Sequence, residues 1–296
     1  MSLRSSPCEP ANDDSPAGGA APSGASLPPL LGEGDPPAVR VLNGDGTAPF
    51  LLVCDHASCA IPRALGTLGL PPEQLVRHIA WDIGVAELTQ LLSARFDAPA
   101  VLSGYSRLVV DPNRALEDPT LIPVVSDDVV VPGNRDLGPD EVERRLAALY
   151  RPYHDTIATM IATMHDRDDA GWVAPAIVSI HSFTPVMRGA GRPWHIGVLW
   201  DRDPRIPVPL IERLRASGRW VVGDNEPYSG RNTLGGTIEL HATPAGLPNV
   251  LVEVRQDLIA ESTGVAEWAE VLGDALAPIL ADPALYRVEH HPRRDD

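Results

Sequence analysis

The residues best suited to chemistry in this sequence are two histidines that stand where apolar segments end. His56 follows the apolar run 49–54, and His181 follows the run 176–180. Zinc in hydrolases binds three histidine or carboxylate ligands and leaves one position for water. We expect Asp82 to complete a site for one divalent ion, with zinc as the leading candidate. Asp82 opens a predicted helix after a proline-containing loop, where it can point back at the strand ends. The alternative is that both histidines are structural or surface residues, since no HExxH motif accompanies them.

Glu253 is a charged residue inside a segment that otherwise has the apolar pattern of a strand. Its neighbours are Val252 and Val254. A buried carboxylate has a pKa that its pocket sets, and such a group can act as the general base in amide hydrolysis. The alternative is an edge strand in which Glu253 faces water or pairs with Arg255.

Two arginines flank another apolar run, in the string SRLVVDPNR at 106–114. Arginine guanidinium groups bind carboxylates through two hydrogen bonds. Arg107 and Arg114 therefore suggest a substrate with two carboxylates, or with one carboxylate and a polarised carbonyl. The alternative is surface ion pairing with Asp111 or Asp118. The substrate-binding residues that we expect are Arg107, Asn113, Arg114, Ser182 and Arg255.

Other catalytic classes have weaker support. Cys54 and Cys59 flank His56 and could indicate a thiolate catalyst, but Cys54 belongs to the apolar run and cysteine is often a small core residue. The sequence has no GxSxG motif and no glycine-rich phosphate loop of the standard types. We expect the glycine-bearing segment 230–236 to form a mobile loop that closes over the site.

Apolar runs of strand length alternate with amphipathic segments of helical period. This alternation predicts a parallel or mixed sheet covered by helices on both faces. In such sheets sites form at the carboxyl ends of strands, which is where the candidate residues stand. The predicted strands are 49–54, 100–102, 107–110, 176–180, 196–200, 220–222 and 250–254, with 237–240 strand-like, and the predicted helices are 72–96, 138–164, 207–217 and 264–280.

Composition narrows the class of protein. The chain has 296 residues and a net charge of −16, which disfavours nucleic acid and anionic membranes as main partners. No apolar run is long enough for a membrane span, the start lacks a signal-peptide pattern, and three cysteines make no disulfide framework, so we expect a cytoplasmic protein. Residues 1–37 are rich in Pro, Gly and Ala and are predicted to be a disordered tail, with a single domain over 38–296. The oligomeric state is left open.

Several strings together resemble the N-formylglutamate amidohydrolase family. They occur in one order and cover roughly residues 47 to 281, which makes the set far more specific than any single string. The strings are CDHAS (54–58), HIAWDIG (78–84), YSRLVVDPNR (105–114), PGN (132–134), SIHSFTP (179–185), RPWHIGVLW (192–200), GDNEPYSG (223–230) and VEVRQDLI (252–259).

The family is more distantly similar to the zinc carboxypeptidases. The resemblance implies a three-layer α/β/α sandwich with a mixed sheet, of the phosphorylase/hydrolase-like type. It also implies that an Asn-Arg pair, here Asn113 and Arg114, holds a substrate carboxylate. One departure is Cys59, which stands where the carboxypeptidase motif has a glutamate ligand, so the third ligand must come from elsewhere. A second is Pro112, where a small residue or cysteine is expected.

The resemblance implies a metal-dependent hydrolase that converts N-formyl-L-glutamate into formate and L-glutamate, a reaction of histidine degradation. His56, Asp82 and His181 would hold the metal, and Glu253 would take a proton from the attacking water. Arg107 and Arg114 would bind the glutamate carboxylates. Two alternatives remain: a hydrolase of another N-acyl amino acid or small amide, and a carboxylate-binding protein without turnover.

Overall fold

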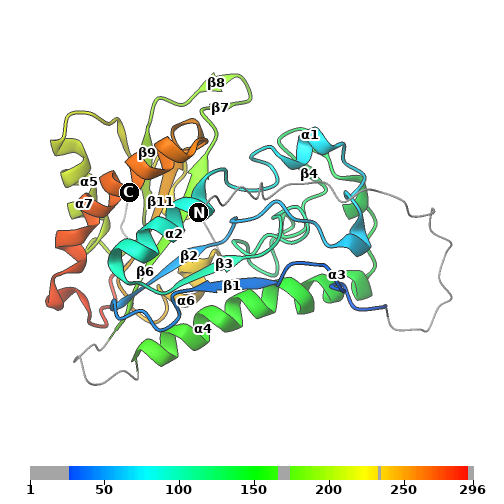
Figure 1. Cartoon of the computed structure of the whole chain (residues 1–296), viewed down its shortest axis with the longest axis horizontal. Helices are drawn as coiled ribbons and strands as arrows, with labels where there is room; N and C mark the ends of the chain where they lie inside the picture. The colour runs from blue at the N-terminus through cyan, green and yellow to red at the C-terminus, as the bar shows by residue number, and fades with distance from the viewer. Residues whose placement is uncertain (1–26, 166–173, 233–234, 293–296) are drawn as a thin grey trace.

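A mixed seven-stranded sheet runs through the centre of the computed structural model (Figure 1). The structure describes residues 27–165, 174–232 and 235–292. In spatial order the strands of the sheet are β1 (Val39–Leu42), β3 (Ala100–Ser103), β2 (Phe50–Cys54), β6 (Ala176–Phe183), β11 (Asn249–Arg255), β9 (Ile196–Leu199) and β10 (Val222–Asp224). Two small hairpins lie outside it, β4 (Val125–Ser126) with β5 (Val129–Val130) and β7 (Val186–Met187) with β8 (Ala190–Gly191).

The direction of the strands brings several strand ends to one edge of the sheet. β3, β2, β6 and β11 run parallel to one another, whereas β9 runs antiparallel to β11 and β10 runs parallel to β9. β1 is the edge strand beyond β3 and pairs antiparallel with it. The carboxyl ends of β2, β6 and β11 therefore meet the beginning of β9, and the prediction of a mixed α/β sheet is confirmed.

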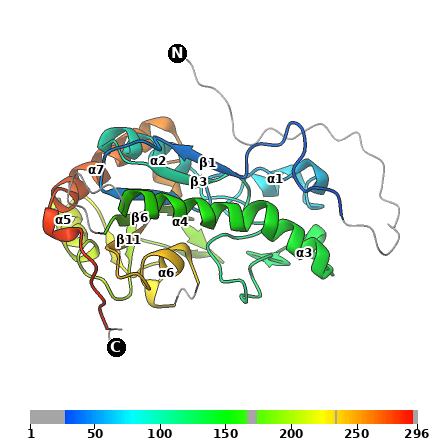
Figure 2. The same cartoon turned by 90° about the horizontal axis from the view of Figure 1, so that it is seen from below.

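Helices cover both faces of this sheet (Figures 1 and 2). The helices α2 (Val85–Phe96), α5 (Pro207–Ala216) and α7 (Ser262–Leu280) pack on one face, where Leu52 and Cys54 of β2 point. The helices α4 (Arg151–His165) and α6 (Thr237–His241) pack on the other, with Leu51 and Val53. Because β2 and β6 are buried along their whole length, their apolar runs lack polar alternation. The remaining helices are α1 (Pro72–Leu75) and α3 (Pro139–Arg145), and a π-helical turn (Leu146–Tyr150) joins α3 to α4.

The predicted strand at 107–110 is wrong. These residues form buried turns in a second apolar cluster, and side chains rather than a strand partner bind their carbonyl groups. The Asn134 amide donates to the Leu108 carbonyl (2.8 Å), and the buried Arg145 donates to the Val109 carbonyl (3.2 Å). A four-residue apolar run can satisfy burial in this way without a sheet, so its composition alone does not identify a strand.

Two further elements differ from prediction. The strand-like segment 237–240 is the helix α6, in which the Leu240 N–H bonds to the Gly236 carbonyl (2.9 Å) and Thr237 is buried. The predicted helix at 72–96 is divided into α1 and α2, since the segment between them ends at Gly84 with a left-handed φ of 82°. Tertiary contacts thus outweigh local propensity at both places.

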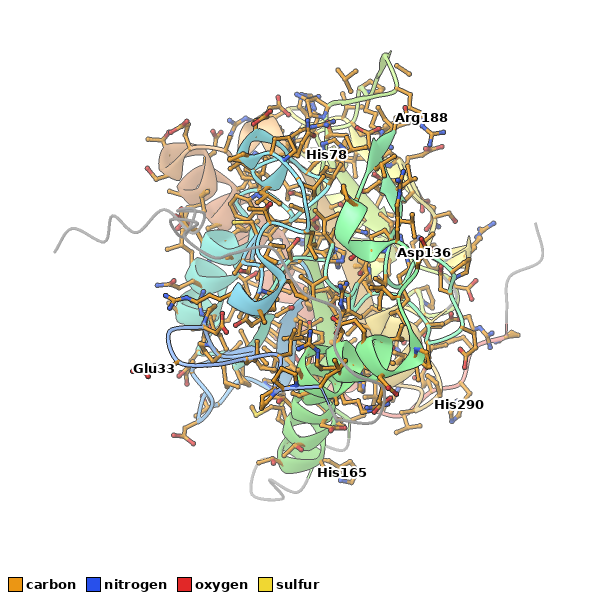
Figure 3. All side chains as sticks on the ribbon, turned by 90° about the vertical axis from the view of Figure 1, so that its right-hand side faces the viewer. Glu33, His78, Asp136, His165, Arg188 and His290 are labelled. Atoms are coloured by element: carbon orange, nitrogen blue, oxygen red, sulfur yellow. The ribbon has the colours of Figure 1, made fainter. Side chains whose placement is uncertain are left out.

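The segment 27–37, which belongs to the predicted tail, lies against the domain where the structure describes it. Leu30 is buried in the second apolar cluster, and the Tyr105 hydroxyl donates to the Pro36 carbonyl (2.6 Å). Glu33 stands at the outer surface (Figure 3). The rest of the predicted tail, residues 1–26, lies outside the described residues. None of the helices in the described ranges has the length and apolar character that a membrane span requires.

Candidate active site

His56, His181 and Glu253 meet at the edge where the carboxyl ends of β2, β6 and β11 lie. Glu253 stands directly opposite His181 in the β6–β11 ladder and opposite Gly197 of β9 on its other side. Both histidines are 2% exposed and Glu253 is 8% exposed. Glu253 therefore lies in a central strand between two others, and the alternative of an edge strand with a solvent-facing glutamate does not hold.

Asp82 reaches the two histidines from the loop that precedes α2. Its backbone N–H donates to the His56 carbonyl (3.0 Å), which fixes this loop against the end of β2. Its Oδ2 lies 2.9 Å from His181 Nδ1 and 3.4 Å from His56 Nδ1. One ligand atom from each of the three residues lies within 4.8 Å of the others, so this buried group has the composition and spacing of a metal site. The helix itself begins at Val85, so Asp82 precedes it rather than opening it.

The second ring nitrogen of each histidine faces another buried aspartate. His56 Nε2 lies 2.7 Å from Asp111 Oδ1, and His181 Nε2 lies 2.8 Å from Asp55 Oδ2. Histidines that bind a metal through one nitrogen usually donate the other N–H to a carboxylate or carbonyl. Asp55 and Asp111 are candidate functional residues that the sequence did not single out for this role. Their positions at the ends of apolar runs were the available signal.

The hydrogen-bond pattern of His181 tests whether a cation fits between these residues. If Nε2–H donates to Asp55, then Nδ1 carries a lone pair that faces the Asp82 carboxylate oxygen at 2.9 Å. Two acceptors at this distance require a proton or a metal ion between them. The His56, Asp82 and His181 atoms thus fit a divalent cation such as zinc.

Electrostatics around the cluster favour charged carboxylates. Burial alone would raise the pKa of Asp55, but the hydrogen bond and charge of His181 lower it to about 2. Burial opposes ionisation of Asp111 in the same way, and the Arg107 guanidinium nevertheless holds its pKa well below the usual range. Burial would lower the pKa of His181, and the hydrogen bonds to Asp55 and Asp82 raise it well above its ordinary value. The site therefore gathers ionised carboxylates, which the positive charges of Arg107 and His181 stabilise.

Glu253 has a different environment from these aspartates. Burial, and the nearby negative charge of Asp82, raise its pKa to about 7, although His181, His56 and Arg107 act in the opposite direction. Its Oε2 is buried, and no hydrogen-bond partner for it lies in the described part of the chain. A carboxylate with a pKa near neutrality and an unoccupied acceptor atom is suited to exchange a proton with a substrate or water.

The three predicted arginines all have acidic partners. Arg107 donates to Asp111 Oδ2 (2.7 Å) and lies 3.3 Å from His56 Nδ1, so it reaches the histidine cluster. Arg114 lies 3.9 Å from Asp111 and 4.0 Å from an oxygen of Asp118. The ion pairs with Asp111 and Asp118, which were the alternative to substrate binding, are thus present.

Arg255, the third of them, pairs with Asp257 through two of its nitrogens (2.7 and 3.1 Å). Its NH1 also donates to the carbonyl groups of Arg192 and Trp194, at 3.5 and 3.4 Å. Arg255 therefore supports the segment that leads into β9.

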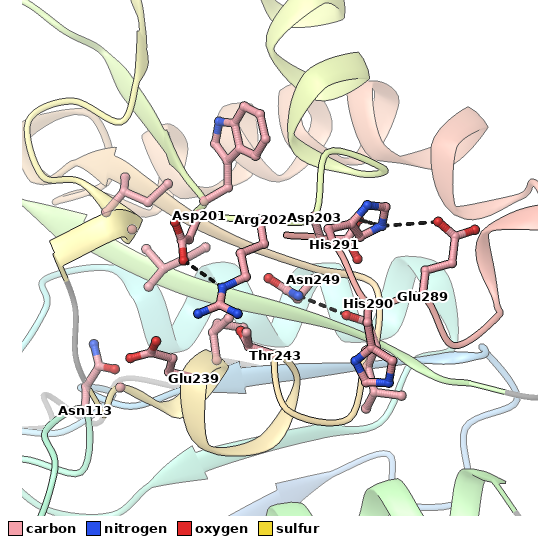
Figure 4. A pocket seen from close by; sticks show the side chains of 18 residues that line it. Asn113, Asp201, Arg202, Asp203, Glu239, Thr243, Asn249, Glu289, His290 and His291 are labelled. Carbon is pink, nitrogen blue, oxygen red and sulfur yellow. Dashed lines mark hydrogen bonds and ion pairs between the residues drawn. The ribbon is translucent and has the colours of Figure 1, made fainter. Parts of the chain in front are cut away.

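Ser182 and Asn113 hold parts of the site in place. The Ser182 backbone N–H donates to Asp82 Oδ2 (3.2 Å), and its hydroxyl donates to the Ile83 carbonyl (3.0 Å). The Asn113 side-chain oxygen accepts the Thr237 N–H (3.0 Å) at the start of α6. Asn113 also lines a pocket beside α6 that extends toward His290 near the carboxyl end (Figure 4). Part of the predicted closing loop, residues 233–234, lies outside the described residues.

Replacement of Asp55 by asparagine is expected to weaken metal binding by about ten- to a hundredfold, the usual effect of losing a carboxylate partner of a ligating histidine. The amide cannot hold the His181 N–H as strongly, so the ring is less well oriented and less basic. The dissociation constant for Zn²⁺, measured by competition with a chelating dye, checks this. An unchanged constant would assign Asp55 to the fold alone, through its bond from the Tyr153 hydroxyl (2.8 Å).

The comparisons with known proteins agree with this geometry. The sequence profile of the N-formylglutamate amidohydrolase family matches residues 48–260. A gene product of Agrobacterium tumefaciens of known crystal structure is 40% identical, with a TM-score of 0.78 over 84% of this chain and 99% of that chain. The N-formylglutamate amidohydrolase of Ralstonia eutropha is 20% identical, with a TM-score of 0.63 over 82% of this chain and 97% of that chain, and supports the fold. No curated protein matches the sequence.

Proposed function

Because the chain belongs to the N-formylglutamate amidohydrolase family, and is therefore a hydrolase of linear amide C–N bonds, we propose that it releases formate from N-formyl-L-glutamate with the help of one divalent metal ion. The observation that carries this proposal is the position of Glu253. Glu253 lies in the central strand opposite His181, at the edge that holds the His56, Asp82 and His181 cluster, and the described residues offer its Oε2 no hydrogen-bond partner. A pure carboxylate-binding protein would gain nothing from another buried anion there.

The chain's own residues can supply the proton transfers and much of the electrostatic stabilisation. A bound metal ion would polarise the formyl carbonyl and make water a better nucleophile. Glu253 takes the proton from the attacking water and later gives it to the leaving amine. Arg107, which lies against both His56 and Asp111, is placed to stabilise negative charge that develops on the carbonyl oxygen.

Residues around the His56, Asp82 and His181 cluster orient the substrate in this proposal. We assign one substrate carboxylate to Arg114 with Asn113, since the Arg114 contacts to Asp111 and Asp118 are long and leave its guanidinium able to exchange partners. Ser182 acts on Asp82, and Arg255 acts on the segment before β9, so both are positioning residues.

The enzyme is expected to hydrolyse N-formylglutamate with a kcat/KM about one to two decades above that for N-formylglutamine. The two substrates have the same length and share the α-carboxylate, and they differ by one side-chain charge. A charge-assisted hydrogen bond is worth about 1.5–3 kcal/mol, and each 1.36 kcal/mol corresponds to about one decade. Formate release from both compounds by the zinc-loaded protein measures this ratio.

The same assay separates the alternatives. Equal specificity constants would reject the glutamate assignment and leave a hydrolase of other N-acyl amino acids. Binding of N-formylglutamate without formate release, with the metal site filled, would indicate a carboxylate-binding protein instead.

A further inference from the structure

Arg192 is an arginine at the site margin that the proposed mechanism does not use. We propose that it binds the side-chain carboxylate of the acyl amino acid and so determines the preference for an acidic substrate. This inference rests on the proposed function, because it names the residue that would recognise the second charge of an N-formyl acidic amino acid.

Aromatic groups hold Arg192 in place. Its NH1 donates to the Tyr228 hydroxyl (2.9 Å), and its guanidinium carbon lies 4.7 Å from the centre of the Tyr228 ring. The Phe183 ring, at the end of β6, lies 5.9 Å from the same atom. Stacking and one hydrogen bond orient a guanidinium without neutralising it, so several of its N–H groups stay available for an anion.

Arg192 differs from the other arginines around the site in its lack of a carboxylate partner among the described residues. Arg107 contacts Asp111 at 2.7 Å, and Arg255 contacts Asp257 at 2.7 Å. Across residues 27–165, 174–232 and 235–292, no carboxylate pairs with Arg192, and the absence is notable in a chain with 40 acidic and 24 basic residues. A half-buried cation without an anion is suited to bind one from the substrate.

Tyr228 connects Arg192 to the proposed catalytic residues. Burial raises the pKa of the Tyr228 hydroxyl, and the charge of Glu253 raises it further, whereas Arg192 and Arg107 act to lower it. The hydroxyl therefore lies within the electrostatic reach of Glu253 and Arg107 while it is hydrogen-bonded to Arg192. A substrate whose amide lies beside Glu253 would extend its side chain past Tyr228 to Arg192.

Their contacts place Arg114 and Arg192 on different sides of the His56, Asp82 and His181 group. Arg114 contacts Asp111, the partner of His56, whereas Arg192 lies against Phe183 at the end of β6. Arg255 also donates to the Arg192 carbonyl, which holds this segment to the end of β11. An acyl amino acid with two carboxylates can thus meet one arginine on each side, with its amide at the centre.

The test compares Arg192→Gln with Arg188→Gln, which removes the same charge from the exposed turn of the β7–β8 hairpin (Figure 3). In Arg192→Gln the ratio of kcat/KM for N-formylglutamate over N-formylglutamine should fall about tenfold or more. Its kcat/KM on N-formylglutamine should fall much less than its kcat/KM on N-formylglutamate. Arg188→Gln should keep the wild-type ratio, and Arg114→Gln should lower kcat/KM for both substrates alike.

Arg192→Lys provides a second variant with the charge retained, and an intermediate ratio is expected because an ammonium group lacks the two-pronged geometry. A wild-type ratio in Arg192→Gln overturns the assignment, and so does an equal loss of kcat/KM on both substrates. Either result leaves the proposed function intact if the wild-type enzyme still prefers N-formylglutamate. Absence of formate release by the zinc-loaded wild type would instead overturn the proposed function itself.

Discussion

Replacement of Glu253 by glutamine is expected to lower kcat for formate release by about two to four decades, the usual cost of losing a general base. Glutamine keeps the shape of the side chain and cannot accept the proton of the attacking water. Metal content should stay near that of wild type, since Glu253 is not one of the three residues whose ligand atoms cluster. Steady-state kinetics and elemental analysis on the same preparation measure both quantities.

The pH dependence gives a second signature of the same group. Burial raises the pKa of Glu253 to about 7, so in the metal-free site the carboxyl takes up a proton as the pH falls through neutrality. A bound cation favours the ionised form, so the acidic limb of kcat/KM for the loaded enzyme should lie below pH 7. Activity is thus retained above this limb and lost below it, and Glu253→Gln should lack the limb.

Glu267→Gln is the matched control, because Glu267 is an exposed glutamate of α7 that pairs with Arg219 at the surface. It should leave kcat, metal content and the pH profile unchanged. Near-normal turnover in Glu253→Gln would contradict the general-base role and return Glu253 to a structural one.

Local sequence pattern places His56, His181 and Glu253 inside predicted strands or directly after them, and the family resemblance selects them as candidate site residues. His56 and His181 follow apolar runs, and the parallel order of β2 and β6 brings the ends of those runs together. Glu253 was identified because a charge interrupts an otherwise apolar strand. Each of these residues stands out within its own segment, and the rules of open α/β sheets account for their proximity.

Asp82 was also predicted, from its place before a helix, but the loop contact that brings it to the two histidines was not, and neither were the roles of Asp55 and Asp111 as histidine partners. Asp82 lies in the site because its N–H bonds to the His56 carbonyl, a contact between segments 26 residues apart that no periodicity encodes. The roles of Asp55 and Asp111 depend on which way each imidazole ring turns. That Arg192 has no acidic partner among the residues the structure describes is likewise a property of the folded arrangement, since the chain contains 40 acidic residues.

The apolar run at 107–110 shows a second limit of prediction from local sequence, because a strand was predicted where the structure has turns. Its composition predicts a strand, yet Asn134 and Arg145 bind the carbonyls of Leu108 and Val109 and hold it as turns. This arrangement keeps Arg107 facing the histidine cluster instead of directing alternate side chains to the two faces of the sheet. The misassigned element is therefore also one that builds the site, which is where local rules most often fail.

Replacement of His181 by alanine is expected to remove most of the bound metal and, with it, formate release. The purified wild-type protein should carry about one divalent ion per chain, as an open site of two histidines and one carboxylate does. Of the three proposed ligands, His181 has the strongest support, because Asp82 contacts its Nδ1 while Asp55 holds its Nε2. Elemental analysis after dialysis, and the recovery of activity on adding Zn²⁺, measure the effect.

His195→Ala is a suitable control, since the His195 ring accepts the Val221 N–H (2.9 Å), and this variant should retain the metal.

The His56→Ala, His181→Ala double variant gives the strictest test, because one carboxylate cannot hold a divalent ion tightly on its own. Full metal occupancy and activity in that double variant would reject the site. Asp82→Ala tests the third ligand separately, and unchanged metal affinity there would withdraw Asp82 while leaving both histidines in place. The His181→Ala variant should regain little activity at high Zn²⁺, because His181 also orders Asp55 and Asp82 around the site.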